Sequence, residues 1–138
     1  MRKRTQARET TLKILYQIDI VHNDAQKAID NYFVYNPELD QEIKDFTTML
    51  VLGTAEHAKE IDEKISKFAT NWELKRMAIV DLNILRLACF EFIYLADIPS
   101  KVTINEAVEL AKRYGGNDSG KFVNGILDKI NKTEFKKP

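Results

Sequence analysis

A glycine-rich segment at residues 115–122 is the part of the sequence that comes nearest to a catalytic motif. It reads Gly-Gly-Asn-Asp-Ser-Gly-Lys-Phe and matches a phosphate-binding P-loop except at its last position, where Phe122 replaces the Ser or Thr that binds Mg²⁺. A P-loop also follows a strand, whereas the apolar spacing before Gly115 is that of a helix. Both requirements fail, so the sequence argues against nucleotide hydrolysis.

The other residues that could do chemistry are too scattered to form a catalytic or metal site. His22 and His57 are isolated from each other, and Cys89 lies in an apolar segment, where a small buried hydrophobe is its simplest interpretation. Carboxylate pairs such as Asp62-Glu63 lie on a charged helical face. We therefore expect no enzymatic activity, no cofactor and no metal, which leaves binding as the function to explain.

The basic residues at the start of the chain are the first candidates for binding. Lys+Arg and Asp+Glu both number 21, so the chain has no net charge and is not a globally basic nucleic-acid binder. The distribution is uneven, because residues 24–63 carry ten acids and three lysines, whereas the first eight residues carry four bases and no acid: Arg2, Lys3, Arg4 and Arg8. This cluster, the basic arm, is either a solvated chain end or a segment that neutralises phosphates.

These residues need a helical frame to position them, because apolar residues recur at close to 3.6 positions almost throughout the chain. The length of 138 residues predicts one domain over residues 1–138, and five Gly with three Pro are too few for a turn-rich β architecture. A single cysteine fits a reducing cytosol, and no apolar run reaches the roughly 18 residues of a membrane span. The predicted class is all-α, with seven helices.

Three of these helices are expected in the first half of the chain. The first covers about residues 4–21, and the second follows Asp24 as its N-cap and ends before Pro37. A third, long helix is expected over residues 39–68, because alternating three- and four-residue apolar steps continue through Gly53.

The second half supplies the other four. Residues 74–95 are apolar on nearly every face, which is typical of the central helix of a bundle, with a short separate helix before about residue 80. Thr103 and Glu106 fit a capping box for a helix that runs to Tyr114 and stops at Gly115-Gly116, where glycine is expected to supply a left-handed turn. Residues 117–119 offer the N-cap of the last helix, whose buried stripe is Val123, Ile126, Leu127 and Ile130.

Two aromatic residues stand apart from these apolar stripes. Tyr16, with Leu12 beside it, lies roughly 150° from the centre of the first helix's stripe, so this pair either packs on a second internal element or forms a partner surface. Phe122 lies roughly 90° from the centre of the last helix's stripe, next to Lys121. Phe122 is therefore either an edge residue of the core or a platform for a stacked base.

Several long strings of residues resemble one known family. Residues 102–115 read Val-Thr-Ile-Asn-Glu-Ala-Val-Glu-Leu-Ala-Lys-Arg-Tyr-Gly and are followed by Asp118-Ser119 and, at 121–128, by Lys-Phe-Val-Asn-Gly-Ile-Leu-Asp. Together with Leu-Arg-Leu-Ala at 85–88, Glu91 and the segment 4–16, they closely resemble the NusB transcription antitermination factors. The similarity covers essentially the whole chain and is strongest over residues 80–128.

The resemblance implies an all-helical fold of two small packed sub-bundles without enzymatic activity. NusB-like proteins pair with NusE, a small-subunit ribosomal protein, bind the single-stranded boxA element of nascent RNA, and help RNA polymerase read through terminators, chiefly in ribosomal RNA operons. The resemblance also implies that such proteins occur as monomers or homodimers. A helical adaptor without RNA binding is the alternative from another class.

The family pattern assigns the binding residues position by position. The RNA-binding positions implied for this chain are Arg2, Lys3, Arg4, Arg8, Asp118, Lys121 and Phe122. The positions implied for NusE are Tyr16 and Asp81. Thr5 and Gln6 stand where the family often has arginine, so fewer phosphate contacts are expected and a partner should be needed for tight RNA binding.

Overall fold

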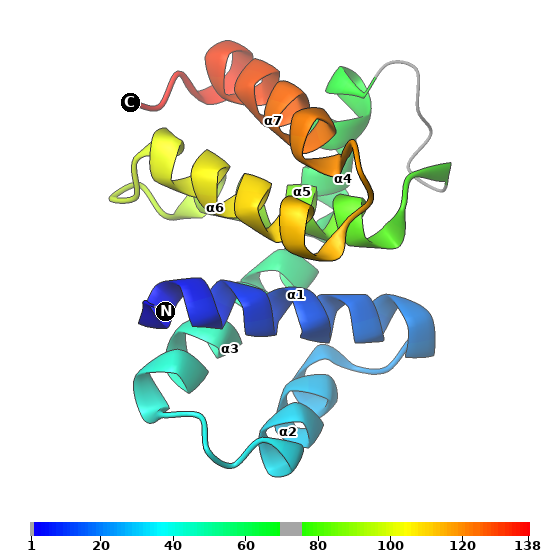
Figure 1. Ribbon diagram of the computed structural model, residues 1–138, viewed down its shortest axis with the longest axis vertical. Helices are drawn as coiled ribbons and strands as arrows, with labels where there is room; N and C mark the ends of the chain where they lie inside the picture. Colours follow the sequence, from blue (N-terminus) through cyan, green and yellow to red (C-terminus); the bar gives the residue numbers. More distant parts are fainter. Residues whose placement is uncertain (1, 70–75) are drawn as a thin grey trace. The chain divides into compact units, whose positions relative to one another are not determined.

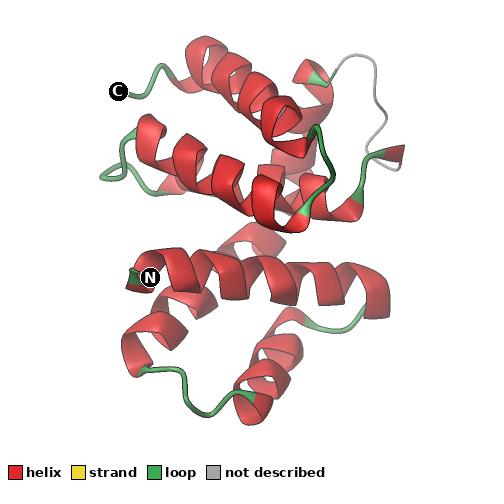
Figure 2. Cartoon of the chain, in the orientation of Figure 1, coloured by secondary structure: helices red, strands yellow, loops and turns green. Residues whose placement is uncertain are grey.

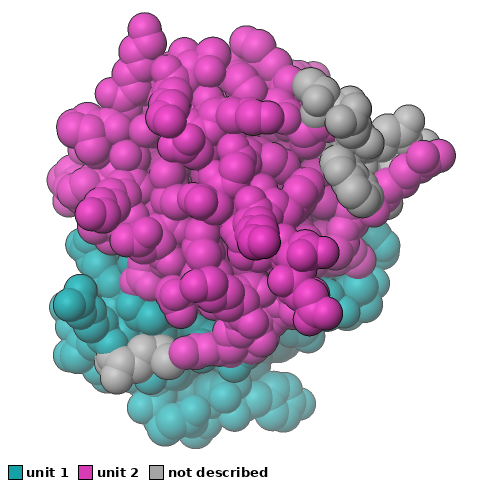
Figure 3. All heavy atoms as spheres, turned by 45° about the horizontal axis from the view of Figure 1, so that its top comes forward, with its two compact units in different colours: residues 1–56 teal, residues 57–138 magenta. Residues whose placement is uncertain are grey.

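The computed structural model describes residues 2–69 and 76–138, and every regular element in these ranges is a helix (Figure 2). The chain divides into two compact units, residues 1–56 and residues 57–138 (Figure 3). The all-α class with seven α-helices is confirmed, whereas the single domain over residues 1–138 stays a prediction. No helix in the described ranges combines the length and apolar character that crossing a bilayer requires.

The first unit is a three-helix bundle. It contains α1 (Lys3–Val21), α2 (Ala25–Tyr35) and α3 (Gln41–Glu56), and α1 packs against both of the others (Figure 1). Asp24 is the N-cap of α2, as expected, and its carboxylate accepts a hydrogen bond from the Lys27 backbone N–H at 3.2 Å. The apolar stripes of the three helices meet in a core that includes Ala7, Ile14, Leu15, Ala28, Ile29, Ile43, Leu50 and Val51.

The second unit is built around one buried helix. It contains α4 (Ala58–Phe68), α5 (Ile79–Tyr94), α6 (Ser100–Tyr114) and α7 (Ser119–Ile130), followed by a π-helical turn, η2 (Asn131–Phe135). Helix α5 packs against α4, α6 and α7, and 11 of its 16 residues are buried, including Cys89. The predicted central helix is therefore confirmed. The short helix expected from residue 74 to about residue 80 lies partly outside the described ranges, at residues 74 and 75; within them, residue 76 has 3₁₀ geometry and residues 77 and 78 are not helical.

An interruption at His57 corrects the expectation of one continuous helix over residues 39–68. His57 has φ −103° and ψ 18°, and it separates α3 from α4, whereas Gly53 lies inside α3. The His57 ring stacks on Tyr94 of α5, with ring centroids 4.2 Å apart, and its Nδ1 lies 3.0 Å from the Tyr94 hydroxyl oxygen. The break occupies one residue, so the apolar periodicity continues across it and gives no sign of it.

The predicted start of α6 is also wrong, because the helix begins one turn before Thr103. Pro99 is the N-cap residue, with an extended backbone, and the Ser100 N–H donates to the Pro138 carbonyl at 2.7 Å. Thr103 is buried inside the helix and donates its hydroxyl to the equally buried Glu91 carboxylate at 3.0 Å. Thr103 thus supplies a hydrogen-bond donor to the buried carboxylate of Glu91 instead of capping the helix.

The end of α6 differs from the prediction in its backbone. The helix ends at Tyr114 as expected, but Gly115 has φ −92° and ψ −171°, which is extended and not left-handed. A Cβ atom at Gly115 would lie 2.5 Å from Ser119 Oγ and 2.7 Å from the Ala111 carbonyl oxygen. Glycine is therefore required here by the close approach of α7 and not by a positive φ.

Candidate nucleic-acid and partner interface

The basic arm occupies the start of α1, where its four cations have different surroundings. Arg2, Lys3 and Arg4 are exposed, whereas Arg8 is 3% exposed and counts among the buried residues. Lys3 Nζ lies 2.9 Å from Glu42 Oε2 and 3.3 Å from Asp40 Oδ2, and the hydrogen bonds to these two carboxylates raise the pKa of Lys3, with Glu42 the larger cause. The acidic start of α3 therefore compensates one charge of the arm.

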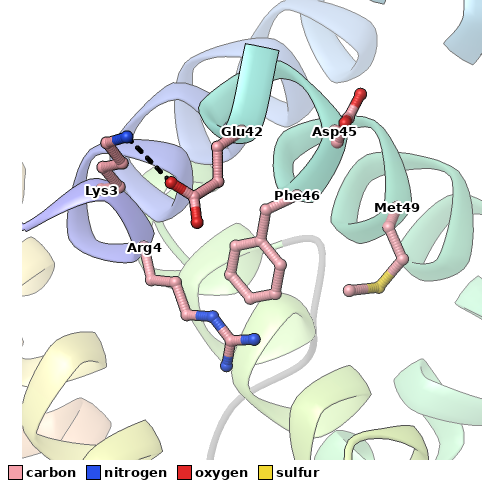
Figure 4. A pocket seen from close by; sticks show the side chains of 6 residues that line it. All are labelled: Lys3, Arg4, Glu42, Asp45, Phe46 and Met49. Atoms are coloured by element: carbon pink, nitrogen blue, oxygen red, sulfur yellow. Dashed lines mark ion pairs between the residues drawn. The ribbon is translucent and has the colours of Figure 1, made fainter. Parts of the chain in front are cut away.

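Both arginines of α1 that follow Lys3 face the same aromatic ring. The Arg4 guanidinium carbon lies 4.6 Å from the centroid of Phe46 on α3, and that of Arg8 lies 5.7 Å from it. Arg4 and Arg8 are one helical turn apart, so a cation–π contact holds each on the side of α1 that packs on α3. Figure 4 shows Lys3, Arg4, Glu42 and Phe46 around one hollow.

The two residues singled out on the far face of α1 separate in the structure. Tyr16 is 42% exposed and available to a partner, whereas Leu12 is only 3% exposed. The internal-packing interpretation therefore holds for Leu12, and the partner-surface interpretation is retained for Tyr16 alone.

In the second unit, three predicted site residues line one pocket. Asp81, in the first turn of α5, faces a pocket of about 520 Å³ that also contains Asp118 and Phe122 from the start of α7; Arg76, Met77, Ala78, Gly116 and Ser119 complete its wall. Asp81 is 8% exposed, and within the described residues its Oδ1 is buried without a hydrogen-bond partner. A buried acceptor without a partner destabilises the fold, and because Oδ1 is closed to solvent it is not offered to a ligand in the pocket.

The start of α7 presents its side chains in two directions. Asp118 is the N-cap residue by position, but its carboxylate makes no capping hydrogen bond. The Ser119 hydroxyl accepts a hydrogen bond from the Gly116 N–H at 2.9 Å, which ties the turn before the helix to its first residue. Phe122 is half-buried, as its position at the edge of the stripe predicts. Lys121 is exposed and lines a separate hollow with Lys112, Gly116 and Asn124. The Phe122 ring and the Lys121 ammonium group thus lie on adjacent faces at the start of α7.

The comparison with known proteins decides the family. The sequence model of the NusB family matches residues 5–132. The chain belongs to the NusB family of transcription antitermination proteins. NusB proteins of Desulforamulus reducens and Anaeromyxobacter dehalogenans are 50% and 47% identical to it over 127 and 128 residues, which is 92% and 93% of this chain and 88% and 89% of theirs. The NusB family is non-enzymatic, in agreement with the expectation from the sequence.

Solved structures agree with this assignment. A crystal form of T. maritima NusB has a TM-score of 0.89 and 37% identity, covering 98% of this chain and 94% of that one. A chain from a crystal structure of the antitermination factors NusB and NusE in complex with double-stranded RNA has a TM-score of 0.87 and 30% identity, covering 96% and 98%. The expected NusB-like fold is thereby confirmed.

Other residues of these sites were not singled out from the sequence. Phe46, Glu42 and Asp40 contact the basic arm, and Met77 shares the pocket of Phe122. The spacing of Glu42 and Phe46, one helical turn apart, places them on one face of α3, but no local signal pairs that face with Lys3 and Arg4. These contacts depend on the packing of α1 against α3.

Proposed function

We propose that this protein binds boxA-type single-stranded RNA together with NusE and promotes read-through by RNA polymerase, chiefly in ribosomal RNA operons. The observation that carries the proposal is the likeness, over 96% of this chain, to a chain crystallised with NusE and RNA. Because nascent RNA and ribosomal proteins are found in the cytoplasm, the proposed activity is cytoplasmic. No net charge and a short basic arm give little non-specific affinity, so tight binding depends on the partner and on contacts to bases.

The RNA-binding residues have distinct roles in this proposal. Arg2, Arg4 and Lys121 are exposed and contact phosphates, while Lys3 and Arg8 hold the arm on α3 through carboxylates and the Phe46 ring. Phe122 stacks on one base, and the neighbouring carboxylate of Asp118 accepts a hydrogen bond from a base edge.

The partner-binding residues are Tyr16 and Asp81. An exposed tyrosine offers rigid apolar area with a polar tip, which is favoured at protein interfaces. Asp81 lines the pocket at the start of α7, where its carboxylate would accept a hydrogen bond from NusE. A homodimer using the Tyr16 face is a competing use of the same surface.

A gel-shift titration with boxA-type RNA, with and without purified NusE, tests the function. We expect a shift at low protein concentration only when NusE is present, and Arg4→Ala should reduce the slope of log affinity against log salt by about 0.7. Lys27→Ala is the matched control, because Lys27 is an exposed lysine on α2 outside the basic arm, and it should leave the slope unchanged. If the protein pairs with NusE but shifts no RNA either with or without NusE, a helical adaptor without RNA binding is favoured.

A further inference from the structure

The first unit contains a hollow beside the basic arm. It has a volume of about 300 Å³ and is lined by Lys3 and Arg4 from α1 and by Glu42, Asp45, Phe46 and Met49 from α3 (Figure 4). The four α3 residues follow the i, i+3, i+4, i+7 spacing of one helix face, and Met49 is 37% exposed. The hollow therefore combines an apolar wall with charged groups of both signs, and its volume is at the small end of ligand pockets.

Arg4 forms the flat, cationic side of this hollow. Its guanidinium lies 4.6 Å from the Phe46 centroid, and within the described residues it makes no hydrogen bond or ion pair. The ring contact fixes the guanidinium while its N–H groups and its outer face stay open. Lys3, by contrast, is held by Glu42 and Asp40 and anchors the backbone from which Arg4 projects.

We propose that this hollow binds one unpaired RNA base, stacked on the Arg4–Phe46 pair with Met49 as its side wall. The inference rests on the proposed RNA binding and adds Phe46, Met49 and Glu42 to the residues that carry it. A base fits because arginine planes and aromatic rings are the surfaces on which unpaired bases stack. The hollow is also continuous with the basic arm, whose exposed Arg2 and Arg4 would attract the phosphates of the same nucleotide.

Glu42 gives the hollow a polar group that can hold the edge of a base. One carboxylate oxygen, Oε2, is taken by Lys3 at 2.9 Å, and Oε1 makes no hydrogen bond or ion pair within the described part of the chain. Figure 4 shows this carboxylate between Lys3 and Arg4, at the rim of the hollow. A free carboxylate oxygen accepts from the exocyclic amine of cytosine, adenine or guanine or from the N3–H of uracil, so it would orient the stacked base without excluding any of the four.

An abasic scan of the RNA tests the inference. The probe is a boxA-type RNA extended at both ends, prepared as a series in which each member lacks one base, and its affinity for the protein–NusE pair is measured by fluorescence anisotropy. With the unchanged protein, loss of the bound base should weaken binding about five-fold or more, the usual effect of one stacked base.

Three variants assign the effect to the hollow. Arg4→Lys keeps the charge but removes the flat guanidinium, so the salt dependence should stay while the penalty at that one abasic position disappears. Phe46→Leu should have the same effect, with its fold checked by circular dichroism. Arg113→Lys is the matched control, because Arg113 is an exposed arginine on α6 outside the basic arm and the hollow, and its abasic profile should be that of the unchanged protein.

The outcomes separate this inference from the proposed function. If the unchanged protein binds RNA but Arg4→Lys keeps the full abasic profile, the base subsite is refuted and the antitermination function stands. If Phe46→Leu weakens pairing with NusE in the absence of RNA, the hollow belongs to the protein partner and the inference is overturned. If no RNA binds with or without NusE, both fail.

Discussion

The ion pair between Arg86 and Asp62 offers a sharp test of what holds the second unit together. Arg86 on α5 donates from Nε to Asp62 Oδ1 at 2.8 Å and from Nη2 to Oδ2 at 2.9 Å, so the pair joins α5 to α4 in a two-pronged geometry. The side chains are 17% and 27% exposed. Arg86 Nη1 also donates to Asn83 Oδ1 at 3.3 Å.

The expected magnitude follows from this burial. Removing one partner of a buried ion pair costs about 3–5 kcal/mol, because the other charge stays desolvated. Since solvent still reaches about a fifth to a quarter of each side chain, the low end applies, and we expect Arg86→Met or Asp62→Leu to lower the free energy of unfolding by about 3 kcal/mol. The double variant Asp62→Leu/Arg86→Met should be closer to the unchanged protein than either single variant, because it leaves no unpaired charge.

Urea unfolding followed by circular dichroism measures these differences. The control is the pair between Lys67 and Glu134, which has the same 2.9 Å separation but a lysine that is 62% exposed. Lys67→Met should cost less than about 1 kcal/mol. Equal losses at the two pairs, or a double variant as unstable as the sum of its singles, would show that burial does not set the strength of the Arg86–Asp62 interaction.

Three further outcomes are expected. Burial raises the pKa of Cys89 to about 12, so the unfolded chain loses this proton first and stability falls as pH rises above 9. Between pH 8 and pH 10 the unchanged protein should lose about 1 kcal/mol more of its unfolding free energy than Cys89→Ala does, measured by urea unfolding. Phe122→Ala should weaken RNA binding by about 1–3 kcal/mol and lower stability by less than the roughly 3–5 kcal/mol of a fully buried Phe; calorimetric melting together with anisotropy checks this, and a large stability loss with unchanged RNA affinity returns the ring to the core. Tyr16→Ala and Asp81→Lys should each weaken NusE pairing in a pull-down while far-UV circular dichroism stays helical, and normal pairing by either variant removes that residue from the interface.

Most of the helical framework was predictable from the sequence, because apolar periodicity reflects the face that each helix buries. It located α1, α2, α5 and α7 and identified Asp24 as a cap. It failed where a contact from another helix overrides a local signal. The His57 ring packs on Tyr94 and interrupts a continuous stripe, and Thr103 bonds to Glu91 although its sequence neighbours form a capping pattern. The count of seven α-helices agrees, although the break at His57 makes two helices of the one expected over residues 39–68.

The sequence supplies candidate site residues but not their arrangement. Exposure of Tyr16 and the edge position of Phe122 follow from their angles around their helices. The charge state of the arm does not follow from its composition, because the acids that compensate Lys3 come from another helix. Nor does spacing reveal that Asp81, which lies more than thirty residues before Asp118, faces the same pocket.

Under the proposed assignment of Asp81 to NusE and Phe122 to RNA, that shared pocket would make RNA and partner binding a linked equilibrium. A ligand that donates to Asp81 and a base that stacks on Phe122 would occupy adjoining parts of one space, so each must alter the free energy of binding the other. The factor by which the partner changes RNA affinity then equals the factor by which RNA changes partner affinity. The affinity of each ligand must therefore be measured both with and without the other. A substitution in this pocket is characterised only when these four affinities are known.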